Sequence, residues 1–183
     1  MLQFDIDASE MRRIADEFAA SEKDLRLAFS RALSRTSRAL RAQARKDLRE
    51  GLGLRAASVL KARLVLQRYR PRGSGLGAAR LWVGANDMPA TYFKGRPRET
   101  SSGARVGAHS FPGAFVGRGA RSGKRVVFKR TGRDRLPIRA ETVPVQEDVN
   151  AILDRQVFDQ VSDLMARNFR AEIRARTIYK VGR

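Results

Sequence analysis

One stretch of the sequence has the residue types of a phosphate-binding loop. Gly117 opens a glycine-rich run that ends in Gly123-Lys124. A phosphate loop needs a glycine, four further residues and then Gly-Lys-Ser/Thr, so that backbone N–H groups surround the phosphates and the hydroxyl reaches Mg²⁺. Here Arg118 stands at the position of the first glycine and Arg125 at that of the hydroxyl residue. The run therefore departs from the motif at two positions.

Acidic and nucleophilic side chains form no catalytic pattern either. The chain has no Cys and 1 His, His109, which excludes thiolate zinc sites and cysteine nucleophiles. Asp5 and Asp7 are a candidate carboxylate pair for Mg²⁺, but a helix N-cap also explains Asp7. A nuclease would place several carboxylates near its basic surface, and residues 51–140 hold only 3. We therefore predict that the protein is not an enzyme and takes no metal or cofactor.

Positive charge is concentrated in the middle of the chain. Lys and Arg number 38 against 19 Asp and Glu, which gives a formal net charge of +19 over 183 residues. Residues 51–140 hold 20 basic and 3 acidic side chains, so they carry nearly all of this excess. Such a block attracts polyanions and repels copies of itself. A GC-rich genome also favours Arg over Lys, so the bias toward arginine leaves two explanations open.

The composition predicts a soluble globular protein of a reducing compartment. Hydrophobic residues make up 42% of the chain, which is close to the globular norm. No apolar run approaches the roughly 20 residues that a membrane span needs. The first residues, MLQFDID, lack the basic and apolar regions of a signal peptide.

The N-terminal third predicts helices. Asp7 and Glu10 resemble a capping box before a short amphipathic segment, and Ser21 with Asp24 gives a second start signal. No Gly or Pro follows before Gly51, so one long helix is expected in between. Its apolar side holds Phe29, Ala32, Leu33, Thr36 and Leu40. Five arginines lie almost opposite, on a face that is either solvated or turned toward phosphate or another subunit: Arg31, Arg35, Arg38, Arg45 and Arg49.

The middle of the chain predicts strands. Leu64–Tyr69 and Ala79–Gly84 read as a pair joined by a Gly-rich loop. Residues 85–123 are rich in Gly, Pro, Ser and Arg, which predicts a long β-arm or a loop that is mobile in the free monomer. Arg125–Lys129 and Leu136–Ala140 form a last pair of strands around a tight turn.

The last pair of strands also predicts an edge and a core face. Pro137 has no N–H to donate to a strand ladder, so its segment is expected at the edge of the sheet. Val126 and Phe128 share one face. We expect Phe111, Phe115 and Phe128 to fill the underside of the sheet rather than to form an RNA-stacking platform.

The fold class predicted from these elements is α+β. A last amphipathic helix is expected from about Glu147 to Arg174. Two long amphipathic helices would then pack on a small antiparallel β-sheet, with a long Gly/Arg-rich loop or β-arm. One domain is expected over residues 1–183, with a helical part at 1–50, a basic β-rich part at 51–140 and the C-terminal helix within 141–183.

A segment of 12 residues, VFKRTGRDRLPI at 127–138, resembles the C-terminal hallmark of the prophage minor tail protein Z family. In that family a strand ending in Phe-x-Arg-x-Gly leads through basic residues into Leu-Pro-Ile. The family then often has Gly-Pro-Ser before a final helix; here Pro144 is kept and the Gly is not. The likeness extends over most of the chain in organisation, and over these 12 residues in detail.

The resemblance implies a structural protein of a tailed phage or prophage. These are tail completion proteins of lambda-like long-tailed phages, so the implied role is a neck component at the head–tail junction. The implied partners are copies of itself in a hexameric or twelve-fold ring, the tail terminator, tail tube and head–tail connector proteins, and non-specific double-stranded DNA in the channel. The implied location is the virion, and the host cytoplasm during assembly. No membrane is among the implied partners. The alternative is a non-enzymatic nucleic-acid-binding protein that contacts the phosphate backbone without sequence specificity.

Two groups of candidate site residues follow from this interpretation. The candidates for docking to a neighbour are Phe128, Arg130, Gly132, Leu136, Pro137 and Ile138. The candidates for facing DNA or phosphate are Arg31, Arg35, Arg38, Arg45, Arg49, Arg118, Arg121, Lys124 and Arg125. Residues 85–123 are expected to order only on docking, because ordering them alone has an entropy cost with little apolar burial to offset it.

Overall fold

The computed structural model describes residues 8–69, 76–120, 122–154 and 160–181. Its described helices are α1 (Ala8–Glu17), α2 (Glu22–Gly51), α3 (Gln146–Leu153) and α4 (Val161–Thr177), with 3-10 turns at Ala57–Leu60 and Ala90–Tyr92. The described strands form four small sheets, all antiparallel, because most strands pair only with their chain neighbours across turns. The predicted α+β class is confirmed, with several small sheets in place of one.

The described chain forms two compact units. Unit 1 takes its residues from Met1–Arg45, Ala62–Gly84 and Leu153–Arg183, and unit 2 takes its residues from Lys46–Lys61 and Ala85–Ile152. Helix α2 therefore contributes most of its length to unit 1 and its last turns to unit 2. A compact unit need not unfold on its own, so the single domain expected from the sequence stays a prediction.

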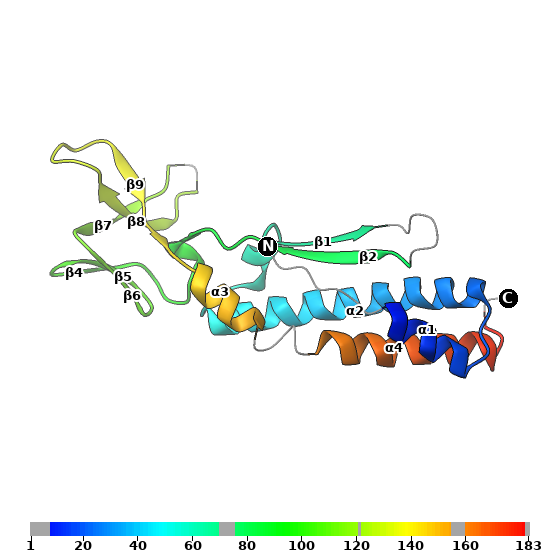
Figure 1. Cartoon of the computed structure of the whole chain (residues 1–183). Coiled ribbons are helices and arrows are strands. Elements are labelled where there is room, and N and C mark those ends of the chain that lie inside the picture. Colours follow the sequence, from blue (N-terminus) through cyan, green and yellow to red (C-terminus); the bar gives the residue numbers. More distant parts are fainter. Residues whose placement is uncertain (1–7, 70–75, 121, 155–159, 182–183) are drawn as a thin grey trace. The chain divides into compact units, whose positions relative to one another are not determined.

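Unit 1 is built around α2. Strands β1 (Leu64–Tyr69) and β2 (Ala78–Val83) form the predicted hairpin, paired from Leu64 opposite Val83 onward. Figure 1 shows this hairpin and α4 lying along α2. Most of the Gly-rich loop between the two strands lies outside the described residues.

The apolar side of α2 forms the core of unit 1, as its periodicity predicts. All five predicted inward positions, from Phe29 to Leu40, are buried. The Phe29 and Phe169 rings meet edge to face, with centroids 6.5 Å apart. Thr36 is buried without loss of hydrogen bonding, because its hydroxyl accepts from Asn168 Nδ2 at 2.9 Å. The buried residues of this core cluster are Met11, Ile14, Ala15, Leu25, Ala28, Phe29, Ala32, Leu33, Leu76, Ala79, Met165, Phe169 and Ile173.

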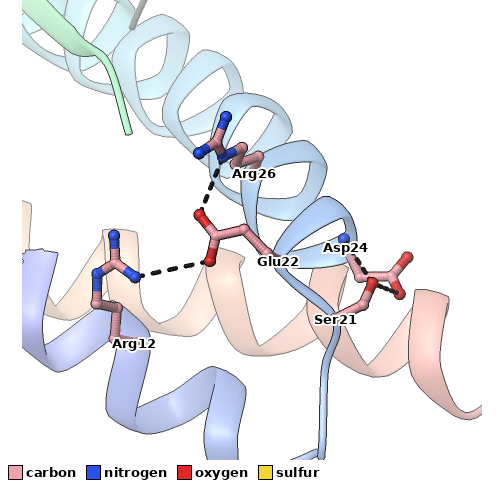
Figure 2. A network of polar contacts seen from close by, with 5 residues as sticks. All are labelled: Arg12, Ser21, Glu22, Asp24 and Arg26. Atoms are coloured by element: carbon pink, nitrogen blue, oxygen red, sulfur yellow. Dashed lines mark hydrogen bonds and ion pairs between the residues drawn. The ribbon is translucent and has the colours of Figure 1, made fainter. Parts of the chain in front are cut away.

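The predicted start signal of α2 is confirmed. Ser21 Oγ accepts a hydrogen bond from the Asp24 backbone N–H at 3.2 Å and donates to the Asp24 carboxylate at 2.7 Å (Figure 2). This satisfies one of the N–H groups that a helix N-terminus leaves without an internal partner. Just beyond, Glu22 bridges Arg12 of α1 at 3.6 Å and Arg26 at 3.0 Å. At the other end, α2 stops at Gly51, and Gly53 follows with a positive φ of 63°, as predicted.

Replacing Ser21 with alanine is expected to lower the free energy of unfolding of unit 1 by about 1 kcal/mol, because the Asp24 N–H loses its acceptor. The chain has 1 Trp, Trp82, which lies in unit 1, so urea unfolding followed by its fluorescence measures the loss. Ser30 is an exposed residue in the interior of the same helix, and Ser30→Ala should change stability by less than about 0.5 kcal/mol. Equal losses in the two variants would contradict the cap.

Unit 2 holds the remaining strands. They are β3 (Met88–Pro89), β4 (Arg98–Thr100), β5 (Gly103–Val106), β6 (His109–Pro112), β7 (Ala114–Arg118), β8 (Arg125–Arg130), β9 (Ile138–Ala140) and β10 (Thr142–Val143). They pair in the orders β10-β3, β4-β5-β6 and β7-β8-β9. Residues 85–123 thus contain β3 to β7, which agrees with the β-arm interpretation. The mobility of this region in the free monomer stays a prediction.

The C-terminal helix expected from Glu147 to Arg174 corresponds to two described helices. Helix α3 ends at Leu153 and belongs to unit 2 except for its last residue, whereas α4 begins at Val161 in unit 1. Residues 155–159 lie outside the described chain, so the prediction of one uninterrupted helix across them stays a prediction. Of the apolar positions expected at helical spacing, five are buried: Val149, Leu153, Val161, Met165 and Phe169. Leu164 is only half-buried, and Val157 lies outside the described residues.

Candidate docking face and basic surfaces

Three of the predicted docking residues share one face of the β7-β8-β9 sheet. In the antiparallel register, Phe115 lies opposite Phe128, and Arg130 lies opposite Ile138. Paired residues, and residues two apart on one strand, project to the same side of a sheet. Phe128, Arg130 and Ile138 are therefore neighbours, together with two residues that the docking prediction did not include. We call this set the aromatic face: Phe115, Val126, Phe128, Arg130 and Ile138.

The side chains of the aromatic face pack on one another but remain partly open to solvent. The Phe115 and Phe128 ring centroids are 6.1 Å apart, and the Arg130 guanidinium lies 5.3 Å from the Phe115 centroid. Gly117 leaves room for them, because a Cβ there would lie 3.0 Å from Phe128 Cδ2. Ile138 is 37% exposed. Aromatic rings packed with an arginine at the surface are typical of the centre of a protein interface.

The expectation that Phe111, Phe115 and Phe128 all fill the underside of the sheet is wrong in part. Phe111 is buried, but Phe115 and Phe128 are only half-buried. The reason is that β8 is buried through Val127, which is 0% exposed and belongs to the opposite face. Alternation along a strand predicts two faces, and it does not say which one meets the core.

The other three predicted docking residues lie in the loop between β8 and β9. Gly132, Leu136 and Pro137 are all exposed, and Leu136 is 66% exposed. Thr131 closes the base of this loop, because its N–H and its hydroxyl both donate to the Pro137 carbonyl oxygen, at 3.2 and 3.1 Å. Strand β9 is the last strand of its sheet, as predicted, but it begins at Ile138 and not at Leu136, so Pro137 lies just before the edge strand. The docking role of these residues stays a prediction.

The basic residues predicted between β7 and β8 gather at one hairpin tip. Arg118 and Arg125 are direct cross-strand partners, and Lys124 is exposed beside them. Arg118 Nη1 donates to the Gly123 carbonyl oxygen at 3.3 Å. Like charges directly opposite one another destabilise a ladder, so this tip gains from a bound anion. Arg121 lies outside the described residues.

The arginines predicted on α2 are all exposed. Arg31, Arg35 and Arg38 line a hollow of about 400 Å³ with Ser30, Ser34 and Glu172. Arg35 pairs with Glu172 at 3.6 Å. Arg45 and Arg49 lie further along the helix and do not line this hollow; Arg49 belongs to unit 2.

A second hollow beside α2 was not predicted. Its volume is about 520 Å³, and Arg68 of β1 lines it together with Arg26, Ser30, Ser34 and Tyr69. The available signal was alternation: Arg68 is two residues from Leu66 and four from the buried Leu64, so it lies on the strand face that packs toward α2. A charge on an otherwise apolar strand face is the sign that was missed.

The residues considered for metal and phosphate chemistry can be located in part. Among the described residues, no group of three or more His, Cys, Asp and Glu side chains could hold a metal ion, and Asp5 and Asp7 lie outside the described chain. His109 packs edge-on against Phe93, with ring centroids 4.4 Å apart. The run from Gly117 to Lys124 joins two antiparallel strands, whereas a phosphate loop joins a strand to a helix. In the described part of the chain, no helix is long and apolar enough to cross a bilayer.

Comparison with protein families gives a match over most of the chain. The model of the family described as prophage minor tail protein Z (GPZ) matches residues 10–179 of the 183. No significant match was found among curated proteins or among solved structures. The matched range covers both compact units, including the β8–β9 segment that carries the sequence resemblance.

Proposed function

Because the chain belongs to the prophage minor tail protein Z family, whose members are structural proteins of phage tails, we propose that it completes the proximal end of the tail at the head–tail junction. The family places the protein in the phage tail and thus in the virion. The finer proposal is a ring of copies, hexameric or twelve-fold, around the DNA channel. Its other neighbours would be the tail terminator, the tail tube and the head–tail connector.

The observation that carries this proposal is the aromatic face at the open edge of β9. Aromatic rings and arginines dominate the centres of protein interfaces. Ile138 brings this face to an edge strand, and Leu136, exposed in the loop just before that strand, is a further apolar anchor. An edge strand has backbone groups that a neighbouring chain can pair with. A surface of this kind supports contact with another protein.

A ring follows from this face if it meets a different surface on the next copy. Head-to-tail contacts of that type close into rings when the rotation allows it. With a net charge of +19, copies repel one another until an anion or an acidic partner is present. The basic hairpin tip and the α2 arginines would supply the positive charge toward DNA.

Replacing Leu136 and Ile138 together with aspartate is expected to reduce head-attached tails by roughly 100-fold, because two apolar anchors would then bring charge into the interface. Both side chains are exposed, so the fold should persist. Electron microscopy of lysates from a prophage carrying the double variant would count free heads, free tails and joined particles. The infectious titre should fall in parallel.

The matched control is the double variant Ile178→Asp and Val181→Asp. These apolar residues are 54% and 53% exposed and lie outside the aromatic face. The control should assemble normally. Equal loss in both double variants, or normal joining in the Leu136/Ile138 variant, would reject the aromatic face as the docking surface.

A further inference from the structure

Two adjoining hollows of unit 1 lie along α2, and we call them together the basic groove. The first lies between α2 and β1, and the second lies between α2 and α4. Ser30 and Ser34 line both hollows, so these two residues form the ridge that joins them. The charged residues of the described lining are Arg26, Arg31, Arg35, Arg38, Arg68 and Glu172.

Arg68 is held in this groove by a specific contact. Its Nη1 donates to the Ser34 hydroxyl oxygen. A guanidinium carries five N–H donors in a planar fork, so this one contact helps to orient the group and leaves other donors for a ligand. Such orientation reduces the entropy lost when an anion binds.

Among the described residues, two acidic side chains pair with arginines of the groove. Glu172 pairs with Arg35 at 3.6 Å, and Glu22 accepts from Arg26 Nε at 3.0 Å (Figure 2). Arg31 and Arg38 are exposed on either side of Arg35 along the helix. Arginine guanidinium groups bind phosphate oxygens in two-point contacts, and serine hydroxyls are common phosphate donors.

We propose that this groove binds the phosphodiester backbone of double-stranded DNA. From residue 26 to residue 38, α2 rises about 18 Å, which is the length of about five base pairs of B-DNA. A row of cations of that length suits a repeating polyanion better than a single compact anion. The proposal deepens the proposed function and rests on it, because the groove would be the channel-facing surface of each copy.

The test measures binding of the isolated full-length chain to a fluorescent DNA duplex at increasing salt. The groove variant replaces Arg31, Arg38 and Arg68 with glutamine and keeps Arg35, the partner of Glu172. The control variant replaces three exposed arginines of unit 1 that line neither hollow: Arg13, Arg167 and Arg170. Both variants lose the same charge.

We expect the groove variant to bind about 100-fold more weakly near physiological salt, and its log–log salt slope to fall by about 2.7, the value for three lost phosphate contacts. The control should lose less than about 5-fold, with a slope change below about 1. Two duplexes of unrelated sequence should behave alike, because backbone contacts carry no sequence information.

A single substitution protects the test against misfolding. Ser30→Glu places a carboxylate on the ridge between the hollows, at an exposed helix position, and should weaken DNA binding by about 5-fold or more. The control Ser162→Glu adds the same charge at an exposed position of α4. The logarithm of its loss of DNA affinity should be about half of the value for Ser30→Glu, or less. Circular dichroism confirms that each variant is folded.

Two outcomes would overturn the proposal. Equal weakening in the groove and control variants would mean that binding follows net charge and not the groove. If the groove variant bound DNA normally but no longer captured a purified tail protein, the ligand of the groove would be an acidic protein surface and not DNA. The measurement uses the isolated chain, so it is independent of the head-joining result for Leu136 and Ile138. Failure of the docking face and failure of the groove are thus distinguishable.

Discussion

Replacing Gly107 with alanine is expected to destabilise unit 2 by at least about 3 kcal/mol. Gly107 has a φ of +57°, and a Cβ there would lie 2.2 Å from the Lys94 carbonyl oxygen. Lys94 has little freedom to move away, because its N–H donates to the Gly53 carbonyl oxygen at 2.8 Å and its neighbour Phe93 bridges Leu54. The clash is between backbone groups, so no side-chain rotation relieves it.

The matched control is Gly123→Ala. Gly123 has a similar φ of +63°, and a Cβ there meets nothing within 4 Å. This variant should lose only about 1–2 kcal/mol, which is what a side chain costs in left-handed backbone conformation. Hydrogen exchange of the β5 amides, at Gly103–Val106, measures the stability of unit 2. Equal losses in the two glycine variants would contradict the close approach of the two segments.

The glycines of the middle region show what a sequence pattern does not predict. Residues 85–123 are rich in Gly, Pro, Ser and Arg, which favoured the interpretation as an arm or loop. In the structure a Cβ on Gly95 would lie 2.6 Å from the Gly107 backbone nitrogen, and a Cβ on Gly103 would lie 2.3 Å from the Phe111 carbonyl oxygen. These glycines allow backbone segments to pack directly on one another. Composition gives the number of glycines but not the partner segment of each.

Elements with local signals at both ends were predicted well. Helix α2 was bounded by the Ser21 cap and by Gly51, and its apolar period fixed the buried side. Strand β1 was predicted at its observed bounds, Leu64–Tyr69. The division of the strands among several sheets was missed, because pairing between segments distant in sequence, such as β3 with β10, leaves no local pattern.

The candidate site was predictable only where one hairpin holds it. Phe128, Arg130 and Ile138 were named together because they lie in one short segment, and the ladder of β8 and β9 places them on one face. Phe115 and Arg68 were not among the predicted site residues, since each joins its group through a contact with another element: Phe115 with Phe128, and Arg68 with Ser34. A group of residues that are distant in sequence becomes visible only in the tertiary structure.

Replacing Phe169 with alanine is expected to destabilise unit 1 by about 3–5 kcal/mol. Phe169 is 0% exposed and packs edge to face on Phe29 in the core cluster. Its removal loses the transfer free energy of the ring and leaves a cavity between α2 and α4. Urea unfolding followed by Trp82 fluorescence measures the loss. Phe18→Ala removes the same atoms from a ring that is only half-buried against this cluster, so it should lose less than half as much.

The same variant tests whether residues 1–183 act as one domain. Phe169 and Trp82 belong to unit 1, and the β5 amides belong to unit 2. If the chain is one cooperative domain, as the sequence predicts, Phe169→Ala must lower the protection of the β5 amides by the same free energy that Trp82 reports. Unchanged β5 protection would contradict the single domain and show that β5 of unit 2 remains folded when unit 1 opens. The reciprocal measurement follows the unfolding of Gly107→Ala by Trp82 fluorescence. In a single cooperative domain, Trp82 must report the same loss of free energy as the β5 amides.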